Sequence, residues 1–256
     1  MSARRKLIAG NWKMHKDLEG CRSLAGSVAS GLGAKLEADV LLCPPAPFLS
    51  TVVEAVSGSG HPIAVGSQNL HDEPQGAYTG EISCEMILST GATWTLIGHS
   101  ERRHVFDEND DFIQKKVVAA LKANLHPILC VGETLDEREA GKTGDVVLGQ
   151  VRAGLRGLES AEIAKTVIAY EPVWAIGTGK TATPEQGAEV HAAIRGEIAE
   201  LAGKDVAEGF RILYGGSVNP GNVKTLLSEP DIDGVLVGGA SLDADKFLAL
   251  CFWERD

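Results

Sequence analysis

Residues 166–171 read Thr-Val-Ile-Ala-Tyr-Glu, an apolar run that ends at a carboxylate. The β-branched and aromatic side chains of this run are typical of a strand buried on both faces of a parallel sheet. Pro172 disfavours the helical region for the residue before it, so Glu171 is expected to project from an extended backbone. The stretch therefore predicts a buried strand that presents an acid at its carboxyl end. A merely solvated carboxylate at the start of a loop is the alternative.

Further short apolar runs alternate with amphipathic segments along the chain. The predicted strands cover residues 6–10, 39–43, 62–66, 93–97, 127–131, 166–170, 211–214 and 234–237. The clearest predicted helix is 184–201, where Thr183 can cap the first turn, Pro184 takes the first helical position and Gln186 completes a capping box. The chain thus consists of eight strand-then-helix units.

Eight such units predict an α/β fold, a closed (β/α)8 barrel of eight parallel strands with outer helices. No linker-like stretch divides the chain, and barrels of this size are single domains, so residues 1–256 are expected to form one domain. A doubly wound open sheet is the alternative. That fold normally has a glycine fingerprint after its first strand, where this chain has Gly10-Asn11-Trp12-Lys13.

The charge balance excludes some partners. The net charge of −11 argues against binding of nucleic acid or an anionic membrane, and the basic run 4–6 is predicted to be only a solvated start. No signal-peptide core or run of transmembrane length is present. The cysteines number five and are widely spaced, which favours free thiols in a reducing cytoplasm. They are Cys21, Cys43, Cys84, Cys130 and Cys251.

A barrel should carry its active groups just after the strands, on the carboxyl-terminal face. Polar, ionisable and glycine residues do follow several predicted strands. They are Asn11 and Lys13, then Gly98-His99-Ser100-Glu101, then Glu171, then Gly215-Gly216-Ser217 and finally Gly238-Gly239. Each has an ordinary explanation alone, as a surface charge, a helix start or a tight turn. Their common position after strands favours one site at one rim.

The two glycine stretches after the seventh and eighth strands suggest a bound anion. Backbone N–H groups there can approach a ligand closely because glycine has no Cβ, and a short helix beginning near Gly239 would direct its positive end to the same place. Phosphate sites of barrel enzymes recur in these two loops. Together with Lys13, the loops can hold a phosphate on an otherwise acidic protein.

The chain resembles the triosephosphate isomerase family over essentially its whole length. The resemblance rests on four motifs, Gly10–Met14, Gly98–Arg103, Ala169–Gly179 and Tyr214–Val218, of which the second and third are highly specific. His15 is a departure, since many members carry Asn there. The resemblance implies interconversion of dihydroxyacetone phosphate and glyceraldehyde 3-phosphate in glycolysis and gluconeogenesis, with neither a metal nor an organic cofactor.

The resemblance also implies a role for each site residue. Glu171 would be the base and a neutral His99 the electrophile. Lys13 and Asn11 would stabilise negative charge on oxygen and phosphate, with Glu101 beside Lys13. The remaining substrate-binding residues would be Gly177, Ser217, Gly238 and Gly239. Residues 174–180 would form a lid that excludes water, with Ile176 and Leu236 pressing on Glu171.

The segment 68–83 is long for a connection between a strand and a helix, which alone indicates a lid, a binding loop or disorder. In the resembled family this loop, here from Gln68 to Ser83, reaches into a second subunit. A homodimer is therefore expected, and a tetramer stays open.

Other functions remain possible on the same barrel. One is a Schiff-base enzyme that uses Lys13, and another is a non-catalytic sugar-phosphate binder. A metal-dependent epimerase would need paired His and carboxylate ligands, which His99 lacks. Gly179-Lys180-Thr181 resembles the end of a nucleotide-binding loop, but Trp174 stands where that motif begins with glycine.

Overall fold

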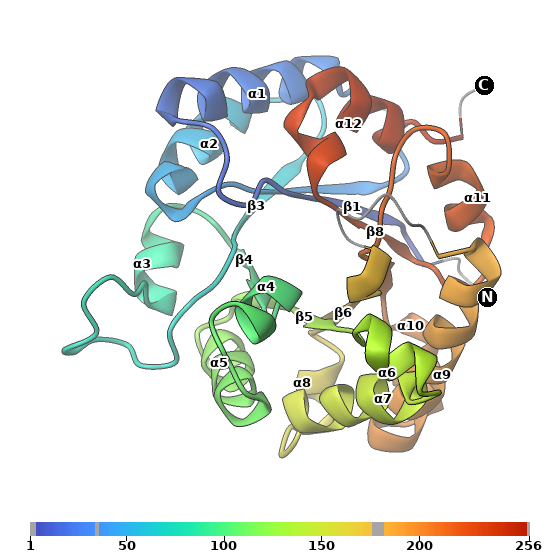
Figure 1. Ribbon diagram of the computed structural model, residues 1–256. Coiled ribbons are helices and arrows are strands. Elements are labelled where there is room, and N and C mark those ends of the chain that lie inside the picture. The colour runs from blue at the N-terminus through green and yellow to red at the C-terminus, as the bar shows by residue number, and fades with distance from the viewer. Residues whose placement is uncertain (1–3, 34–35, 176–181, 255–256) are drawn as a thin grey trace.

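The fold is described from a computed structural model that covers residues 4–33, 36–175 and 182–254. Parallel strands pair in chain order, and the first also pairs with the last, so the sheet closes into a barrel (Figure 1). The strands are β1 (Leu7–Asn11), β2 (Asp39–Cys43), β3 (Ile63–Ser67), β4 (Trp94–Ile97), β5 (His126–Val131), β6 (Val167–Tyr170), β7 (Ile212–Tyr214) and β8 (Gly234–Val237). The predicted (β/α)8 barrel is confirmed.

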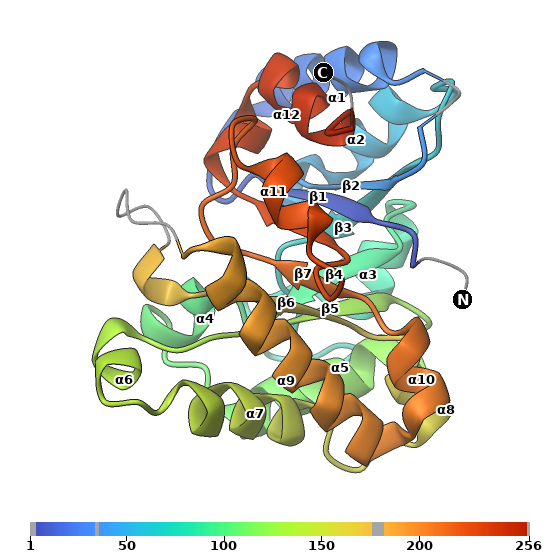
Figure 2. The same ribbon diagram turned by 90° about the vertical axis from the view of Figure 1, so that its right-hand side faces the viewer.

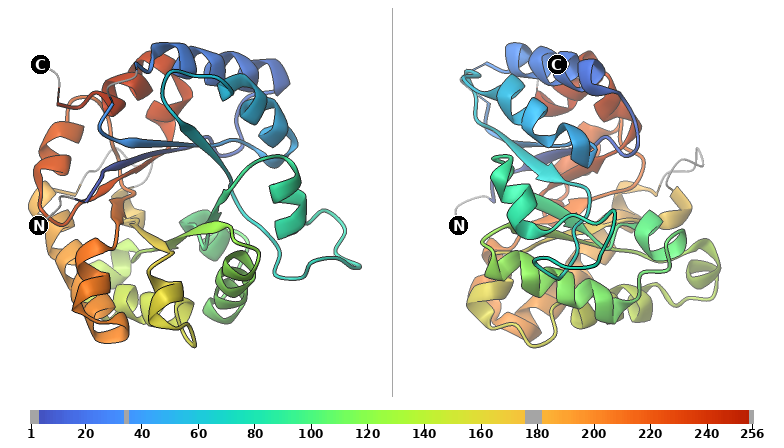
Figure 3. Two further views of the ribbon diagram at one scale, coloured as in Figure 1. Left: turned by 180° about the vertical axis from the view of Figure 1, so that it is seen from behind. Right: turned by 90° about the vertical axis from the view of Figure 1, so that its left-hand side faces the viewer.

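Helices surround the strands in every view (Figures 1 and 3). The α-helices are α1 (Leu18–Gly31), α2 (Leu49–Val56), α3 (Cys84–Ser89), α4 (Ser100–His104), α5 (Asp110–Lys122), α6 (Leu135–Glu139), α7 (Thr143–Gly154), α8 (Ser160–Ile163), α9 (Pro184–Ala202), α10 (Lys204–Gly209), α11 (Val223–Ser228) and α12 (Ala244–Cys251). Three short 3-10 helices span Ala46–Phe48, Val173–Ala175 and Gly239–Leu242. None of the helices in the described part of the chain is long and apolar enough to cross a membrane.

The strands separate two apolar cores. Successive side chains of a strand point to opposite faces, so Leu7 and Ala9 of β1 pack inside the barrel while Ile8 packs outward against the helices. The inner core is small, and the outer core between the strands and the helices is much larger. Burial on both faces explains why the strands read as continuous apolar runs.

The predicted strand limits agree with the structure to within about one residue at each end. The helix predicted from Pro184 begins there and continues to Ala202. Its capping box is present, because Thr183 accepts from the backbone N–H of Gln186, and the Gln186 side chain accepts from Thr183. Local signals of this kind depend on a few adjacent residues, so the sequence alone predicts them well.

The basic start of the chain differs from its prediction. Arg4 pairs with Asp233 at 2.5 Å, and the Lys6 ammonium donates to the carbonyl of Ile232 at 2.5 Å. Both side chains are partly buried against the amino-terminal end of the barrel. The prediction of a solvated start is wrong for these two residues, because their partners lie more than 200 positions away in the sequence.

All strands run the same way, so their carboxyl ends share one face of the barrel. In Figure 2, α4 and α6, which follow β4 and β5, lie on the left, whereas the amino terminus lies on the right. Residues that follow different strands are therefore brought to the left-hand face.

Candidate active site

A hollow of about 370 Å³ opens at the carboxyl-terminal face of the barrel. Its lining comes from the ends of β1 and β8 and from the loops after β1, β4, β6, β7 and β8. The lining residues are Asn11, Trp12, Lys13, His15, His99, Glu171, Gly215, Gly216, Ser217, Val218, Leu236, Gly238, Gly239, Ala240 and Leu242. The structure thus brings together all the residues predicted to bind or react except two. Glu101 contacts the lining from outside, and Gly177 lies outside the described residues.

Glu171 and His99 form the buried centre of this hollow. His99 Nε2 lies 3.0 Å from Oε1 of Glu171, and the backbone N–H of Ser100 donates to Oε2 of the same carboxylate at 2.9 Å. Only 2% of Glu171 and 6% of His99 are exposed. Both oxygens of the carboxylate therefore have a partner on the β4–α4 connection, which removes the alternative of a merely solvated acid.

The other ring nitrogen of His99 defines its tautomer. Nδ1 accepts a hydrogen bond from the backbone N–H of Glu101 at 3.2 Å, in the first turn of α4. A nitrogen that accepts must carry a lone pair, so the ring proton is on Nε2 and faces Glu171. The neutral ring is consequently a donor toward the hollow.

The two groups shift each other's pKa. Burial alone lowers the pKa of His99, but the charge and hydrogen bond of Glu171 raise it above its ordinary value. Burial raises the pKa of Glu171, whereas His99, the Ser100 N–H and Lys13 lower it below its ordinary value. Each shift depends on the direct contact, so a ligand that separates the two side chains removes much of its cause.

Lys13 is held rigidly beside this pair. Its ammonium lies 2.6 Å from Oε1 of Glu101, and its backbone has φ of +52°, a region that side chains other than glycine rarely adopt. Its N–H donates to Oδ1 of Asn11 at 3.0 Å, and its carbonyl accepts from Gln68 at 2.8 Å. These partners hold a strained backbone, and strain of this kind is typical of functional sites.

Glycines allow the backbone around Glu171 to pack closely. A Cβ on Gly132 would lie 1.7 Å from the Glu171 carbonyl oxygen, and a Cβ on Gly215 would lie 2.8 Å from Cγ of Glu171. Neither position has room for a side chain. The loops after β5 and β7 therefore confine Glu171 from both sides.

The loops after β7 and β8 form the far wall of the hollow. Ser217, Gly238 and Gly239 line it, and a 3-10 helix begins at Gly239 as predicted. The side chain of Lys13 reaches this wall, since its Cε lies 3.5 Å from where a Cβ of Gly238 would be. The Lys13 side chain and the backbone of these glycines thus border the same space, which suits an anion.

Glu133 also contributes to the site region, although the sequence analysis did not single it out. It is fully buried, and its Oε1 accepts from Tyr170 at 3.1 Å, from Trp174 at 3.0 Å and from Arg138 at 3.0 Å. The sequence does contain a signal for Glu133, because it is a charged residue two positions after β5, just as Lys13 is two positions after β1. Most of the predicted lid, residues 176–180 with Ile176 and Gly177, lies outside the described residues.

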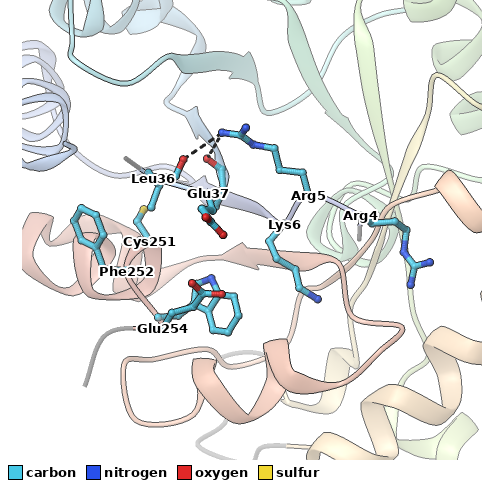
Figure 4. Close-up of a pocket in the computed structure, with 10 residues that line it drawn as sticks. Arg4, Arg5, Lys6, Leu36, Glu37, Cys251, Phe252 and Glu254 are labelled. Atoms are coloured by element: carbon cyan, nitrogen blue, oxygen red, sulfur yellow. Dashed lines mark hydrogen bonds between the residues drawn. The ribbon is translucent and has the colours of Figure 1, made fainter. Parts of the chain in front are cut away.

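A larger hollow, of about 540 Å³, lies at the opposite end of the barrel (Figure 4). Arg4, Arg5 and Lys6 line it, but each side chain already has hydrogen-bond partners. Arg5 donates to the carbonyls of Leu36 and Ala38 and pairs with Asp39 at 2.7 Å. Arg4 and Arg5 are paired with carboxylates and the Lys6 ammonium donates to a backbone carbonyl, so this hollow is a weaker candidate for an anion than the site at the carboxyl ends of the strands. Within the described residues, no cluster of three or more His, Cys, Asp or Glu side chains is placed to hold a metal ion.

A closed barrel of eight βα units, with an acid, an imidazole and an ammonium at the carboxyl ends of its strands, defines a (β/α)8-barrel enzyme. Comparison with known proteins identifies which kind. The family model for triosephosphate isomerase matches residues 6–253, and the chain belongs to this family.

Individual relatives match over nearly their whole length. The triosephosphate isomerase of Roseiflexus sp. (strain RS-1) is 53% identical over 96% of both chains. That of Rhodopirellula baltica is 50% identical over 97% of both. That of Moorella thermoacetica is 51% identical, covering 98% of this chain and all of the relative.

Proposed function

We propose that the protein interconverts dihydroxyacetone phosphate and D-glyceraldehyde 3-phosphate, with Glu171 as the base. Membership of the triosephosphate isomerase family at about 50% identity supports the reaction. The observation that carries the assignment of residues is the 3.0 Å contact between His99 and Glu171 inside the hollow. An acid and a neutral donor so placed can act on adjacent atoms of a single three-carbon ligand.

In this proposal the substrate enters between the two side chains. The Glu171 carboxylate removes a proton from C1 of dihydroxyacetone phosphate, and the C–H electron pair forms the C1–C2 double bond of an enediolate. The Nε2–H of His99 donates to the carbonyl oxygen and moves the hydroxyl proton between O1 and O2. Glu171 then returns its proton to C2, which yields the aldehyde. No atom is gained or lost.

Separation of the pair also prepares His99 for this role. While the two side chains touch, Glu171 raises the pKa of His99 against the effect of burial. Once a carbonyl lies between them, burial and the Glu101 N–H on Nδ1 remain, and both favour the neutral ring. The substrate therefore meets a neutral donor and not an imidazolium.

Lys13 and Asn11 are assigned electrostatic roles, and Glu101 holds the Lys13 ammonium. Phosphate is assigned to the wall formed by Ser217, Gly238 and Gly239, with Gly177 added by family resemblance. Support comes from the position of Lys13 between the reacting pair and this wall. A phosphate there would be held by one fixed cation and by backbone dipoles, which cost no reorganisation during the reaction.

The assignment can be tested with one coupled assay on glyceraldehyde 3-phosphate in the presence of EDTA. The wild-type protein should isomerise the substrate at an undiminished rate, and Glu171→Gln should lose at least about 10³-fold in kcat, within the range of general acid–base contributions. Substrate binding without turnover would favour the non-catalytic binder. Trapping of a covalent adduct on Lys13 by borohydride would favour the Schiff-base alternative.

The proposed assembly is a homodimer built around the loop from Gln68 to Ser83. In Figure 1 the segment between β3 and α3 projects away from the barrel. Among the described residues, the exposed large apolar side chains concentrate in the first four βα units. They include Met14, which is 94% exposed, Tyr78 at 44%, Met86 at 54% and Phe106 at 60%. An apolar surface of this kind suits a second copy of the chain.

Sedimentation velocity at nanomolar concentration tests this assembly. A fully active monomer would contradict the homodimer, and a larger species would show a tetramer.

We further place the activity in glycolysis and gluconeogenesis, in the cytoplasm and on one domain spanning residues 1–256. Free, buried cysteines at all five positions agree with a reducing compartment.

A further inference from the structure

Arg103, in α4, has hydrogen-bond partners in the loop after β4, in β5 and in α5. Its Nε donates to the carbonyl of Gly98 at 2.9 Å, and one terminal nitrogen donates to the carbonyl of Cys130 at 3.1 Å. The other terminal nitrogen pairs with Asp110, the first residue of α5, at 2.6 Å. Only 8% of the side chain is exposed. One guanidinium thus joins the ends of β4 and β5 to a neighbouring helix.

The two carbonyls need this partner because the sheet is interrupted beside them. Pairing of β4 with β5 ends at Ile97 and Leu129, since Gly98 turns away with φ of +69°. Neighbouring residues of a parallel strand bond to opposite sides. The Val131 carbonyl accepts from Glu171 on the β6 side at 2.7 Å, so the Cys130 carbonyl faces the β4 side, where the ladder has ended. The Arg103 guanidinium donates to the Cys130 carbonyl in place of a backbone N–H from β4.

Both attachments lie next to the reacting pair. Gly98 directly precedes His99, and Cys130 directly precedes Val131, which holds the backbone of Glu171. Gly98 has no room for a side chain beside Arg103, because a Cβ there would lie 3.2 Å from the guanidinium and 3.1 Å from Ile113. The distance between His99 and Glu171 therefore depends on how far apart Arg103 holds the ends of β4 and β5.

We propose that Arg103 is a positioning residue for the reaction, which sets the separation of His99 and Glu171 without touching the substrate. This inference rests on the proposed function for its effect on turnover. A lysine cannot replace it, because one ammonium cannot reach two carbonyls and a carboxylate in the planar arrangement that the guanidinium provides. A displacement of about 1 Å in such a pair can cost about 10²-fold in rate.

The test compares Arg103→Lys and Arg103→Ala with wild type and with a matched control, Arg156→Ala. Arg156 pairs with Asp111 on the surface, with 60% and 75% of the two side chains exposed, and this partner is not one of those that Arg103 contacts. We expect kcat to fall about 10-fold in Arg103→Lys and about 10²-fold in Arg103→Ala. KM should stay within about twofold, because the loops after β7 and β8 are not attached to Arg103. The control should keep both constants.

Chemical rescue separates positioning from stability. Guanidinium chloride at about 50 mM is far below denaturing concentrations. At this concentration it should raise the activity of Arg103→Ala about 10-fold, whereas sodium chloride at the same ionic strength should not. An unchanged kcat in both folded variants would overturn the inference. So would a loss of kcat that disappears when the variants are assayed well below their Tm, because that loss would come from unfolding. If Arg103→Ala does not fold, Asp110→Asn replaces it. Loss of the charge that orients the guanidinium should lower kcat about threefold, and a wild-type kcat would count against the proposal.

A second readout does not depend on turnover. The ¹⁵N shifts of the His99 ring, measured without substrate, should differ between wild type and Arg103→Lys and should be unchanged in Arg156→Ala. A shift difference with an inactive wild-type protein would mean that the proposed function fails while the positioning holds. If the wild-type protein is active and Arg103→Lys has the same shifts and the same kcat as wild type, the proposed function holds and the positioning role fails.

Discussion

His99 Nε2 lies 3.0 Å from Oε1 of Glu171, although the two residues follow strands that are not neighbours in the barrel. The strand between them is β5, whose last residue, Val131, accepts from the backbone of Glu171 at 2.7 Å. The geometry of this proposed reactive pair therefore depends on the ends of three consecutive strands, β4, β5 and β6. Substitutions that alter the pair, the packing around it or the fixed cation beside it should affect turnover in different ways.

Shortening the side chain of Glu171, the proposed base, should reduce the rate and leave binding almost unchanged. Glu171→Asp keeps the charge but withdraws the carboxylate by one methylene, and we expect kcat to fall by at least about 10²-fold. KM should change by less than about threefold, since phosphate is assigned to the opposite wall. Steady-state kinetics in both directions provide the measurement. A near-native kcat would remove Glu171 from the reaction.

Filling the space beside the base should also slow the reaction. In Gly215→Ala the new methyl group would lie 2.8 Å from Cγ of Glu171, so the buried carboxylate must move. We expect kcat to fall about 10- to 100-fold. The control is Gly149→Ala in α7, where no atom lies within 4 Å of a new Cβ. That variant should keep its kcat and gain about 0.5–1 kcal/mol of stability. Equal kinetics in the two variants would contradict the confinement of Glu171.

Releasing the Lys13 ammonium should weaken its electrostatic role. Glu101→Gln removes the charge that lies 2.6 Å from this ammonium, and we expect kcat/KM to fall about 10-fold. Glu19→Gln is the matched control, because Glu19 pairs with Arg22 on the surface at 2.8 Å and belongs to no site. Kinetics at several salt concentrations check the prediction. A loss shared by both variants would instead indicate a general effect of charge.

Acid should destabilise the fold through His191. This residue is fully buried in α9, its Nδ1 lies 3.1 Å from the carbonyl of Asp231, and burial lowers its pKa to about 4. Unfolded chains take up the proton near pH 6.5, so stability is full above that pH and is lost as the pH falls toward 4. The loss should amount to about 3 kcal/mol.

Urea unfolding between pH 7 and pH 4 measures this loss, with His191→Gln as the comparison. The variant should lose part of the acid dependence, whatever its stability at pH 7. Identical slopes of stability against pH for the two proteins would exclude His191 as the cause.

Strands and strand-end residues could be predicted because their signals are local. Apolar runs define the strands, and the parallel order brings Lys13, His99 and Glu171 to one face without any knowledge of their contacts. The pairing of Lys13 with Glu101 could be expected only from family resemblance. The position of a residue after a strand indicates on which face of the barrel it lies, but not which side chain it contacts.

Long-range polar contacts escaped prediction. Arg4 reads as one more surface cation, yet it pairs with Asp233 across 229 positions of sequence. Arg103 lies in a motif that draws attention to His99, so its own contacts with Gly98 and Cys130 are hidden in the sequence. Partners of this kind become visible only when strands are placed beside one another, since neither composition nor periodicity encodes them.

Closure of the barrel also has a consequence for synthesis. Because β1 pairs with β8 as well as with β2, one edge of β1 stays unpaired until β8 has left the ribosome. Growing chains that end before Gly238 also lack the wall that Gly238 and Gly239 supply. Activity in a cell-free translation reaction should therefore appear only with products that extend past Gly239, and shorter nascent chains are the form most exposed to aggregation.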